Sequence, residues 1–390
     1  MTLHERITGI LASAVQNGEC AGVNVLVRRH GKELLYAQAG MADIEACRPI
    51  RRDDIFRLYS QTKPITAAAV MLLAERGLID LMDGVDRYLP GFRNPQVVDA
   101  KGNLTRAYRA PWLIELLGMT AGLSYPGEDP AGQYAARVFE EAHEAIRHGG
   151  GIPTVEFINR LGRQPLAFQP GTHWRYSTCA DVLGAVVEVV SGKKFGDFLR
   201  EELFEPLEMS DTAFFVPEDK RDRLVTCYER TGAGLAPWLG MHLACGVYDR
   251  APAFESGGAG LVSTLEDYSH FADMMMNGGV WQGRRILSPG SVAFLTAPQL
   301  TDDVRKDMWD SLNGYSYGKL CRVCEEPGRV AGLALKDEYG WDGWLGAYYA
   351  NFPREGLTIL SMQNTTNAGT APVVRRVRNA VLAALSRGEI

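Results

Sequence analysis

One stretch decides how this chain is interpreted: Ile55-Phe56-Arg57-Leu58-Tyr59-Ser60-Gln61-Thr62-Lys63-Pro64-Ile65. A strand-like run ends at Tyr59, and a helix is predicted from Ser60, with Pro64 in the first turn, where proline is tolerated. Lys63 follows Ser60 by three positions, so both side chains lie on one helix face. The positive potential of a helix N-terminus would favour an uncharged lysine and stabilise a serine alkoxide. Lys63 could therefore activate Ser60 as a nucleophile.

Strand-like runs lie at both ends of the chain, and helical patterns lie between them. The predicted elements are a helix over 3–17, a β-hairpin over 21–29 and 33–40, helices over 66–77 and 265–278, strands over 348–353 and 357–362, and a last helix over 373–385. The simplest packing is an α+β fold (an α/β sandwich), with one antiparallel sheet from both chain ends flanked by helices. We expect a sheet domain of residues 1–80 and 255–390, a mainly helical domain of residues 81–254, and an active site at their interface.

The composition is that of a globular protein, because 46% of the 390 residues are hydrophobic and 23% are charged. A net charge of -6 gives no electrostatic reason to bind nucleic acid or an anionic membrane. The N-terminal segment lacks the features of a signal peptide, and no run approaches a membrane span, so a cytoplasmic location is expected. Cys321 and Cys324 could form half a zinc site or a redox pair, but the odd total of seven cysteines favours reduced thiols. No metal or cofactor is predicted.

Two further segments add residues that suit acyl chemistry. Gln169-Pro170-Gly171-Thr172-His173-Trp174-Arg175-Tyr176-Ser177 is a turn that presents Tyr176, which could relay a proton to or from a leaving group. Tyr339-Gly340-Trp341-Asp342-Gly343-Trp344-Leu345-Gly346 has glycines that permit close backbone approach, so the Trp344 N–H could join the Ser60 N–H in an oxyanion hole. Each segment alone also fits a structural role: a packed tyrosine, an aromatic strand, or a helix-capping serine before a surface lysine.

Taken in order, these segments resemble the serine β-lactamase and penicillin-binding-protein superfamily, most closely family VIII carboxylesterases and class C β-lactamases. Residues 116–123, 205–212 and 256–261 are similar to further blocks of that family, so the resemblance covers nearly the whole chain. It implies that Ser60 is the acylated nucleophile and Lys63 the base for acylation. It also implies that Tyr176 shuttles the proton to the leaving group and helps to activate water. The backbone N–H groups of Ser60 and Trp344 would hold the oxyanion.

The chain departs from the β-lactamase motifs at positions that contact substrate. Tyr176-Ser177-Thr178 replaces Tyr-x-Asn, and Trp341-Asp342-Gly343 replaces Lys-Thr-Gly, whose lysine supplies charge for the lactam carboxylate. Anionic substrates should therefore bind poorly. Asp342 either faces solvent, which we favour, or contacts a cationic or hydroxyl-bearing substrate. The predicted substrate-binding residues are Trp341, Asp342, Gly343, Tyr125 and Trp174.

The leading hypothesis is a carboxylesterase that acts on neutral, short-chain or moderately bulky esters. Alternatives are an acyltransferase with the same machinery, a D-amino-acid amidase, peptidase or weak β-lactamase, and an inactive ligand-binding module. The expected partner is a small-molecule ester or acyl donor. An α/β-hydrolase is disfavoured because Ser60 does not lie in a Gly-x-Ser-x-Gly segment. We expect His173 to be a hydrogen-bonding loop residue rather than a triad base.

Overall fold

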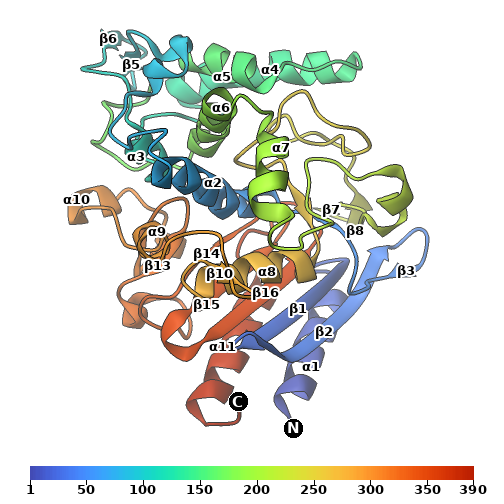
Figure 1. The fold of residues 1–390 in the computed structure, drawn as a ribbon. Helices are drawn as coiled ribbons and strands as arrows, with labels where there is room; N and C mark the ends of the chain where they lie inside the picture. The colour runs from blue at the N-terminus through green and yellow to red at the C-terminus, as the bar shows by residue number, and fades with distance from the viewer.

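The computed structural model describes residues 1–390 and is built around an eight-stranded sheet (Figure 1). The strand order is β12-β13-β14-β15-β16-β1-β2-β3, and every neighbouring pair is antiparallel. The strands are β1 (Gly22–Arg29), β2 (Lys32–Asp43), β3 (Arg48–Pro49), β12 (Tyr315–Tyr317), β13 (Arg322–Cys324), β14 (Tyr339–Asp342), β15 (Tyr348–Phe352) and β16 (Leu357–Gln363). The N-terminal and C-terminal parts of the chain meet where β1 pairs with β16, which confirms the predicted α+β fold.

The central strands are buried on both faces, because side chains along a strand alternate between the two faces. Val23, Val25 and Val27 of β1 belong to the core beneath the two terminal helices. Leu26 points the other way and joins the main core. The predicted hairpin is confirmed: β1 and β2 pair around His30 and Gly31, which both have the positive φ that such a tight turn needs.

Helices cover both faces of the sheet. Helices α1 and α11 pack together on one face, and α8 contacts β1, β15 and β16 from the other (Figure 1). A further group of helices, drawn in blue-green to green, stacks above α8. The helices are α1 (Leu3–Gln16), α2 (Lys63–Glu75), α3 (Leu113–Leu117), α4 (Pro130–Arg147), α5 (Thr154–Gly162), α6 (Cys179–Ser191), α7 (Phe195–Leu199), α8 (Leu265–Met276), α9 (Pro289–Leu295), α10 (Asp302–Arg305) and α11 (Pro372–Ser386).

Helix α2 begins at Lys63, three residues later than predicted. Residues Tyr59–Thr62 form a 3₁₀ turn instead. Proline has no N–H, so Pro64 cannot donate the α-helical hydrogen bond to the Ser60 carbonyl. The Lys63 N–H donates to that carbonyl instead, which closes the tighter turn. Ser60 therefore precedes the helix rather than opening it.

Four two-stranded ribbons complete the fold, and the sequence reading missed most of them. They are β4 (Phe56–Arg57) with β9 (Val262–Ser263), β5 (Gln96–Val98) with β6 (Leu104–Arg106), β7 (Tyr228–Thr231) with β8 (Gly234–Pro237), and β10 (Val280–Trp281) with β11 (Arg284–Arg285). All three residues of β6 are exposed, so no alternation of apolar and polar residues marks it. The β4–β9 ribbon matters most, because it holds the glycine-rich segment 256–261 beside Ser60.

None of the helices has the length and apolarity that a membrane span requires. All seven cysteines are free, and only Cys47 is exposed. Burial raises the pKa of Cys20, Cys179, Cys245, Cys321 and Cys324 to about 12.

Candidate active site

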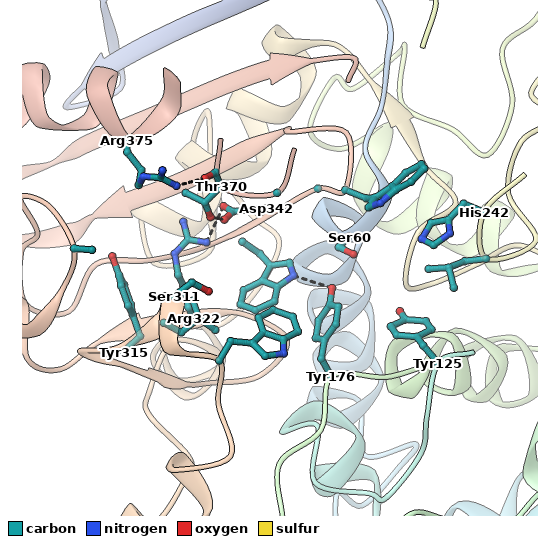
Figure 2. A pocket seen from close by; sticks show the side chains of 18 of the residues that line it. Ser60, Tyr125, Tyr176, His242, Ser311, Tyr315, Arg322, Asp342, Thr370 and Arg375 are labelled. Carbon is teal, nitrogen blue, oxygen red and sulfur yellow. Dashed lines mark hydrogen bonds and ion pairs between the residues drawn. The ribbon is translucent and has the colours of Figure 1, made fainter. Parts of the chain in front are cut away.

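Ser60 opens onto a cavity of about 550 Å³ between the end of β14 and the helices above the sheet. Tyr125, Tyr176, Trp341 and Trp344 also line this cavity. Figure 2 shows Ser60 near its centre, with Tyr125 and His242 on one side and Asp342, Arg322 and Arg375 on the other. The three predicted segments, which carry Ser60, Tyr176 and Trp341 and lie far apart in the sequence, thus meet at one cavity.

Lys63 is the most buried charged group beside the serine, with no exposed surface. Its Nζ donates hydrogen bonds to Ser60 Oγ at 3.2 Å, Tyr125 OH at 3.1 Å and the Gly258 carbonyl at 2.8 Å. All three acceptors are uncharged, and Lys63 forms no ion pair. The predicted contact between Ser60 and Lys63 is therefore present, and each donor direction of the ammonium is used.

Asp181, which was not predicted from the sequence, acts on Lys63 through the glycine-rich segment. Its carboxylate accepts from the Gly258 N–H at 3.0 Å and from Ser256, while the Gly258 carbonyl accepts from Lys63. Burial raises the pKa of Asp181, and the positive charge of Lys63 opposes that rise. A Cβ atom on Gly258 would come within 2.8 Å of the Asp181 carboxylate, so only glycine allows this approach. A carboxylate inside the apolar run of residues 179–187 was the available signal.

Tyr125 and Tyr176 flank the lysine. Lys63 Nζ lies 4.6 Å from the centre of the Tyr176 ring, and the two tyrosine rings are 5.7 Å apart. Burial keeps the pKa of Tyr125 well above its usual value, so its hydroxyl stays protonated. The Tyr176 hydroxyl accepts a hydrogen bond of 3.0 Å from the Trp341 indole N–H. Tyr125, predicted as a substrate contact, is thus a direct partner of the lysine as well.

Two backbone N–H groups at the cavity have no acceptor within the protein. These are the N–H groups of Ser60 and Trp344, the pair predicted to form an oxyanion hole. The chain brings them together through Gly343, because a Cβ atom there would lie 2.2 Å from the Leu58 carbonyl oxygen. Glycine at position 343 therefore lets the end of β14 pack directly against the nucleophile segment.

Trp174 is the one predicted substrate contact that is not on the cavity wall. Its side chain is 4% exposed, and its ring packs 6.4 Å from that of Tyr176, which it supports from behind. The expectation of direct substrate contact is corrected accordingly. His173 forms a hydrogen bond, as predicted: its ring contacts the Asp307 carboxylate at 3.0 Å, and it is not among the residues that line the cavity.

Asp342 does not face solvent, contrary to the favoured interpretation. Its carboxylate pairs with the Arg322 guanidinium at 2.7 Å and accepts from the Thr370 hydroxyl (Figure 2). The two charged side chains are 14% and 4% exposed. The register of β13 and β14, in which Arg322 lies opposite Gly340, sets this pairing, and the sequence does not reveal it.

Comparisons with known proteins agree with this geometry. The family model described as Beta-lactamase matches residues 7–384. Esterase EstB of Burkholderia gladioli is 30% identical over 407 residues, which cover 98% of this chain and 96% of EstB.

Solved structures show the same fold. The structure of EstCE1, described as a hydrolase with promiscuous acyltransferase activity, has a TM-score of 0.81 at 26% identity and covers 97% of this chain and 98% of its own. Simvastatin synthase LovD from Aspergillus terreus has a TM-score of 0.80 at 22% identity over 99% of both chains, a likeness of fold alone. The protein is an enzyme of the serine hydrolase type, and it belongs to the Beta-lactamase family.

Proposed function

We propose that the protein is a serine carboxylesterase that forms an acyl-enzyme on Ser60. One observation carries the proposal: Ser60 Oγ accepts a 3.2 Å hydrogen bond from a fully buried lysine at the wall of a large cavity. A serine hydroxyl is a weak nucleophile unless a base lies within hydrogen-bond reach. Lys63 in its uncharged form meets that requirement.

Acylation would proceed in two proton transfers. Lys63 takes the hydroxyl proton as Ser60 Oγ attacks the ester carbonyl, and the N–H groups of Ser60 and Trp344 donate to the oxyanion. The tetrahedral intermediate then collapses and releases the alcohol, whose oxygen needs a proton. Tyr176 is suited to deliver it, since its ring lies against Lys63 and Trp341 fixes its hydroxyl. Water then attacks the acyl-enzyme, and the two proton transfers run in reverse. Tyr176 takes a proton from the water, and Lys63 returns one to Ser60 Oγ as the acid leaves.

The charges around the cavity support a neutral ester. Two of its three arginines are paired with carboxylates, Arg322 with Asp342 and Arg378 with Glu338. Arg375 has no carboxylate partner, but it is exposed, where water and salt screen its charge. Trp341 presents an aromatic ring where the β-lactamase motif has a lysine. Apart from Lys63, whose three donor directions are already used, a lactam carboxylate would therefore find no buried cation free to bind it.

Acyl transfer to an alcohol is a second candidate, because EstCE1 is described as having that activity beside hydrolysis. The two reactions share every step up to the acyl-enzyme. They differ only in whether water or an alcohol then attacks it.

Acyl-enzyme formation can be tested with p-nitrophenyl acetate and p-nitrophenyl butyrate. We expect turnover of both esters and an acyl adduct that intact-mass and peptide analysis place on Ser60. Ser60→Ala should remove the adduct and the turnover, whereas Ser13→Ala, an exposed serine on α1, should change neither. A wild-type protein without adduct or turnover would overturn the proposal. Faster discharge of the adduct by added alcohols would favour acyl transfer.

A further inference from the structure

A tight turn over residues 242–245 presents His242 to the active-site cavity. The turn is closed by two hydrogen bonds, from the His242 N–H to the Cys245 carbonyl at 2.9 Å and from the Cys245 N–H back to the His242 carbonyl at 3.0 Å. Its central residues, Leu243 and Ala244, have φ values of 53° and 56°. Such turns normally use asparagine or glycine at these positions, because other residues are strained there.

The surroundings hold this strained turn in place. The Ala244 N–H donates to His143 Nε2 of α4 at 3.1 Å, and Ala244 and Cys245 are buried. Strain of this kind persists only where the packing overdetermines the backbone, and it concentrates at functional sites. The strained turn therefore indicates a functional role for the His242 side chain that it positions.

The His242 ring is fixed against the residues that would form the oxyanion hole. It stacks on the Trp344 indole, with ring centres 4.2 Å apart, and lies 5.9 Å from the Tyr59 ring, directly before Ser60 in the chain. Neither ring nitrogen has a hydrogen-bond partner in the protein, and the side chain lines the same cavity as Ser60. Figure 2 shows the His242 ring beside Ser60, on a different side from Tyr176.

His242 is uncharged at neutral pH. Burial, His143 and the charge of Lys63 together lower the pKa of His242 to about 4. A neutral imidazole offers one N–H donor and one nitrogen acceptor. That combination matches a hydroxyl group, which both donates and accepts, better than it matches a carboxylate, which only accepts.

The two sides of Ser60 receive different parts of an ester. In the proposed function the leaving alcohol takes its proton from Tyr176, so the alcohol lies on the Tyr176 side. The acyl chain then extends to the other side, towards His242 and Trp344. We propose that His242 determines acyl specificity by binding a hydroxyl group on the acyl chain, so that hydroxyacyl esters are the preferred substrates. This inference rests on the proposed carboxylesterase function.

An unsubstituted alkyl chain would cover both imidazole nitrogens and leave them without partners. A polar group that loses water without gaining a partner costs free energy, so alkyl esters should react more slowly. One net hydrogen bond corresponds to about a tenfold preference. A preference for hydroxyacyl esters larger than tenfold would require that water be completely excluded from the His242 imidazole.

The test compares the hydrolysis of ethyl butyrate with that of both enantiomers of ethyl 2-hydroxybutyrate and of ethyl 3-hydroxybutyrate. Titration of the released acid in a pH-stat at pH 7.5 measures each rate. We expect kcat/KM for at least one hydroxy ester to exceed that for ethyl butyrate about tenfold. His242→Phe keeps a ring to stack on Trp344 but removes both nitrogens, so the ratio should fall to about one. His242→Asn, which restores a donor and an acceptor, should recover part of the preference.

Two results would overturn the inference while leaving the esterase proposal intact. One is a wild-type enzyme that hydrolyses ethyl butyrate as fast as every hydroxy ester. The other is a preference that His242→Phe does not change, which would place the hydroxyl group elsewhere. If no ester is turned over and Ser60 carries no adduct, the proposed function itself fails. Circular dichroism and thermal unfolding of each variant separate loss of specificity from loss of folding.

Discussion

Lys63 and Arg322 are both buried beside the same cavity, and their partners are of opposite kinds. Lys63, directly behind Ser60, donates three hydrogen bonds to uncharged oxygen atoms. Arg322, on β13, forms an ion pair of 2.7 Å with Asp342. Asp181, a buried acid close enough to feel the charge of the lysine, is separated from it by the Gly258 peptide.

The kind of partner determines which of the two cations can act in proton transfer. A lysine held in a tight ion pair would keep its proton, whereas one surrounded by neutral acceptors can give it up and act as a base. A guanidinium does not lose its proton in proteins, so Arg322 can only be neutralised by a partner. Asp342 therefore neutralises Arg322 in the wall of the cavity, whereas no carboxylate is bonded to Lys63, the proposed base.

Removal of the unpaired cation should have the largest effect. We expect Lys63→Ala to lower kcat/KM for p-nitrophenyl butyrate by about 10³-fold, because Ser60 loses its base. Lys101→Ala, at an exposed turn, is the matched control. Stopped-flow measurement of acylation checks the step directly, and a near-wild-type acylation rate would show that another group deprotonates Ser60.

Removal of the partner of the paired cation should affect stability instead. Asp342→Asn leaves Arg322 buried without a counter-ion, and we expect a loss of about 3 kcal/mol in the free energy of unfolding. Asp303→Asn breaks an ion pair with Lys306 whose side chains are 91% and 73% exposed, and it should change stability little. Urea titration measures both. If both variants lost the same free energy of unfolding, Asp342 would not be needed to neutralise a buried Arg322.

The Trp341 indole N–H donates to Tyr176, whose ring centre lies 4.6 Å from Lys63 Nζ. Trp341→Phe removes the 3.0 Å hydrogen bond to Tyr176, and we expect kcat to fall about tenfold as the hydroxyl loses its orientation. In a Tyr176→Phe background the same substitution should cost little, since the acceptor is already gone. Additive effects in this double-mutant cycle would mean that Trp341 acts through substrate contact.

The smallest effect concerns the titration of His242. Because the charge of Lys63 contributes to the low pKa of His242, about 4, Lys63→Ala should raise that pKa. Carbon-13 or proton NMR of the imidazole reports the change. An unchanged His242 pKa in Lys63→Ala would mean that burial and His143 account for it alone.

The same low pKa makes stability depend on pH. The unfolded chain protonates this histidine near pH 6.5, whereas the folded protein does so only near pH 4. The unfolded state therefore binds more protons in this window, and stability falls as the pH drops from 6.5 to 4. His242→Phe should make that fall shallower.

Local signals in the sequence predicted the nucleophile segment and the terminal strands, whereas contacts across the sheet remained hidden. Ser60 and Lys63 meet because a short turn joins them, and the absence of a proline N–H even explains why that turn is 3₁₀. The pairing of Arg322 with Asp342 depends on the register of β13 against β14, which no local pattern encodes.

The same limit applies to the residues behind the site. Asp181 could have been found as a carboxylate in an apolar helix, but its partner Gly258 is 77 residues away along the chain. Nothing in the sequence of the turn around His242 indicates its positive φ values, because leucine and alanine rarely adopt them. Trp174 shows the converse error. Its proximity to Tyr176 in the sequence led to the prediction of a substrate contact, but its ring packs behind that of Tyr176.

The distribution of thiols has a practical consequence. Six of the seven cysteines are buried, and Cys47 alone is exposed, at the turn between β2 and β3. A maleimide reagent attacks thiolates that it can reach, so the native protein offers one site for a fluorophore or a surface linker. That turn lies at one edge of the sheet, so a probe attached there would stand at the opposite edge of the sheet from β12.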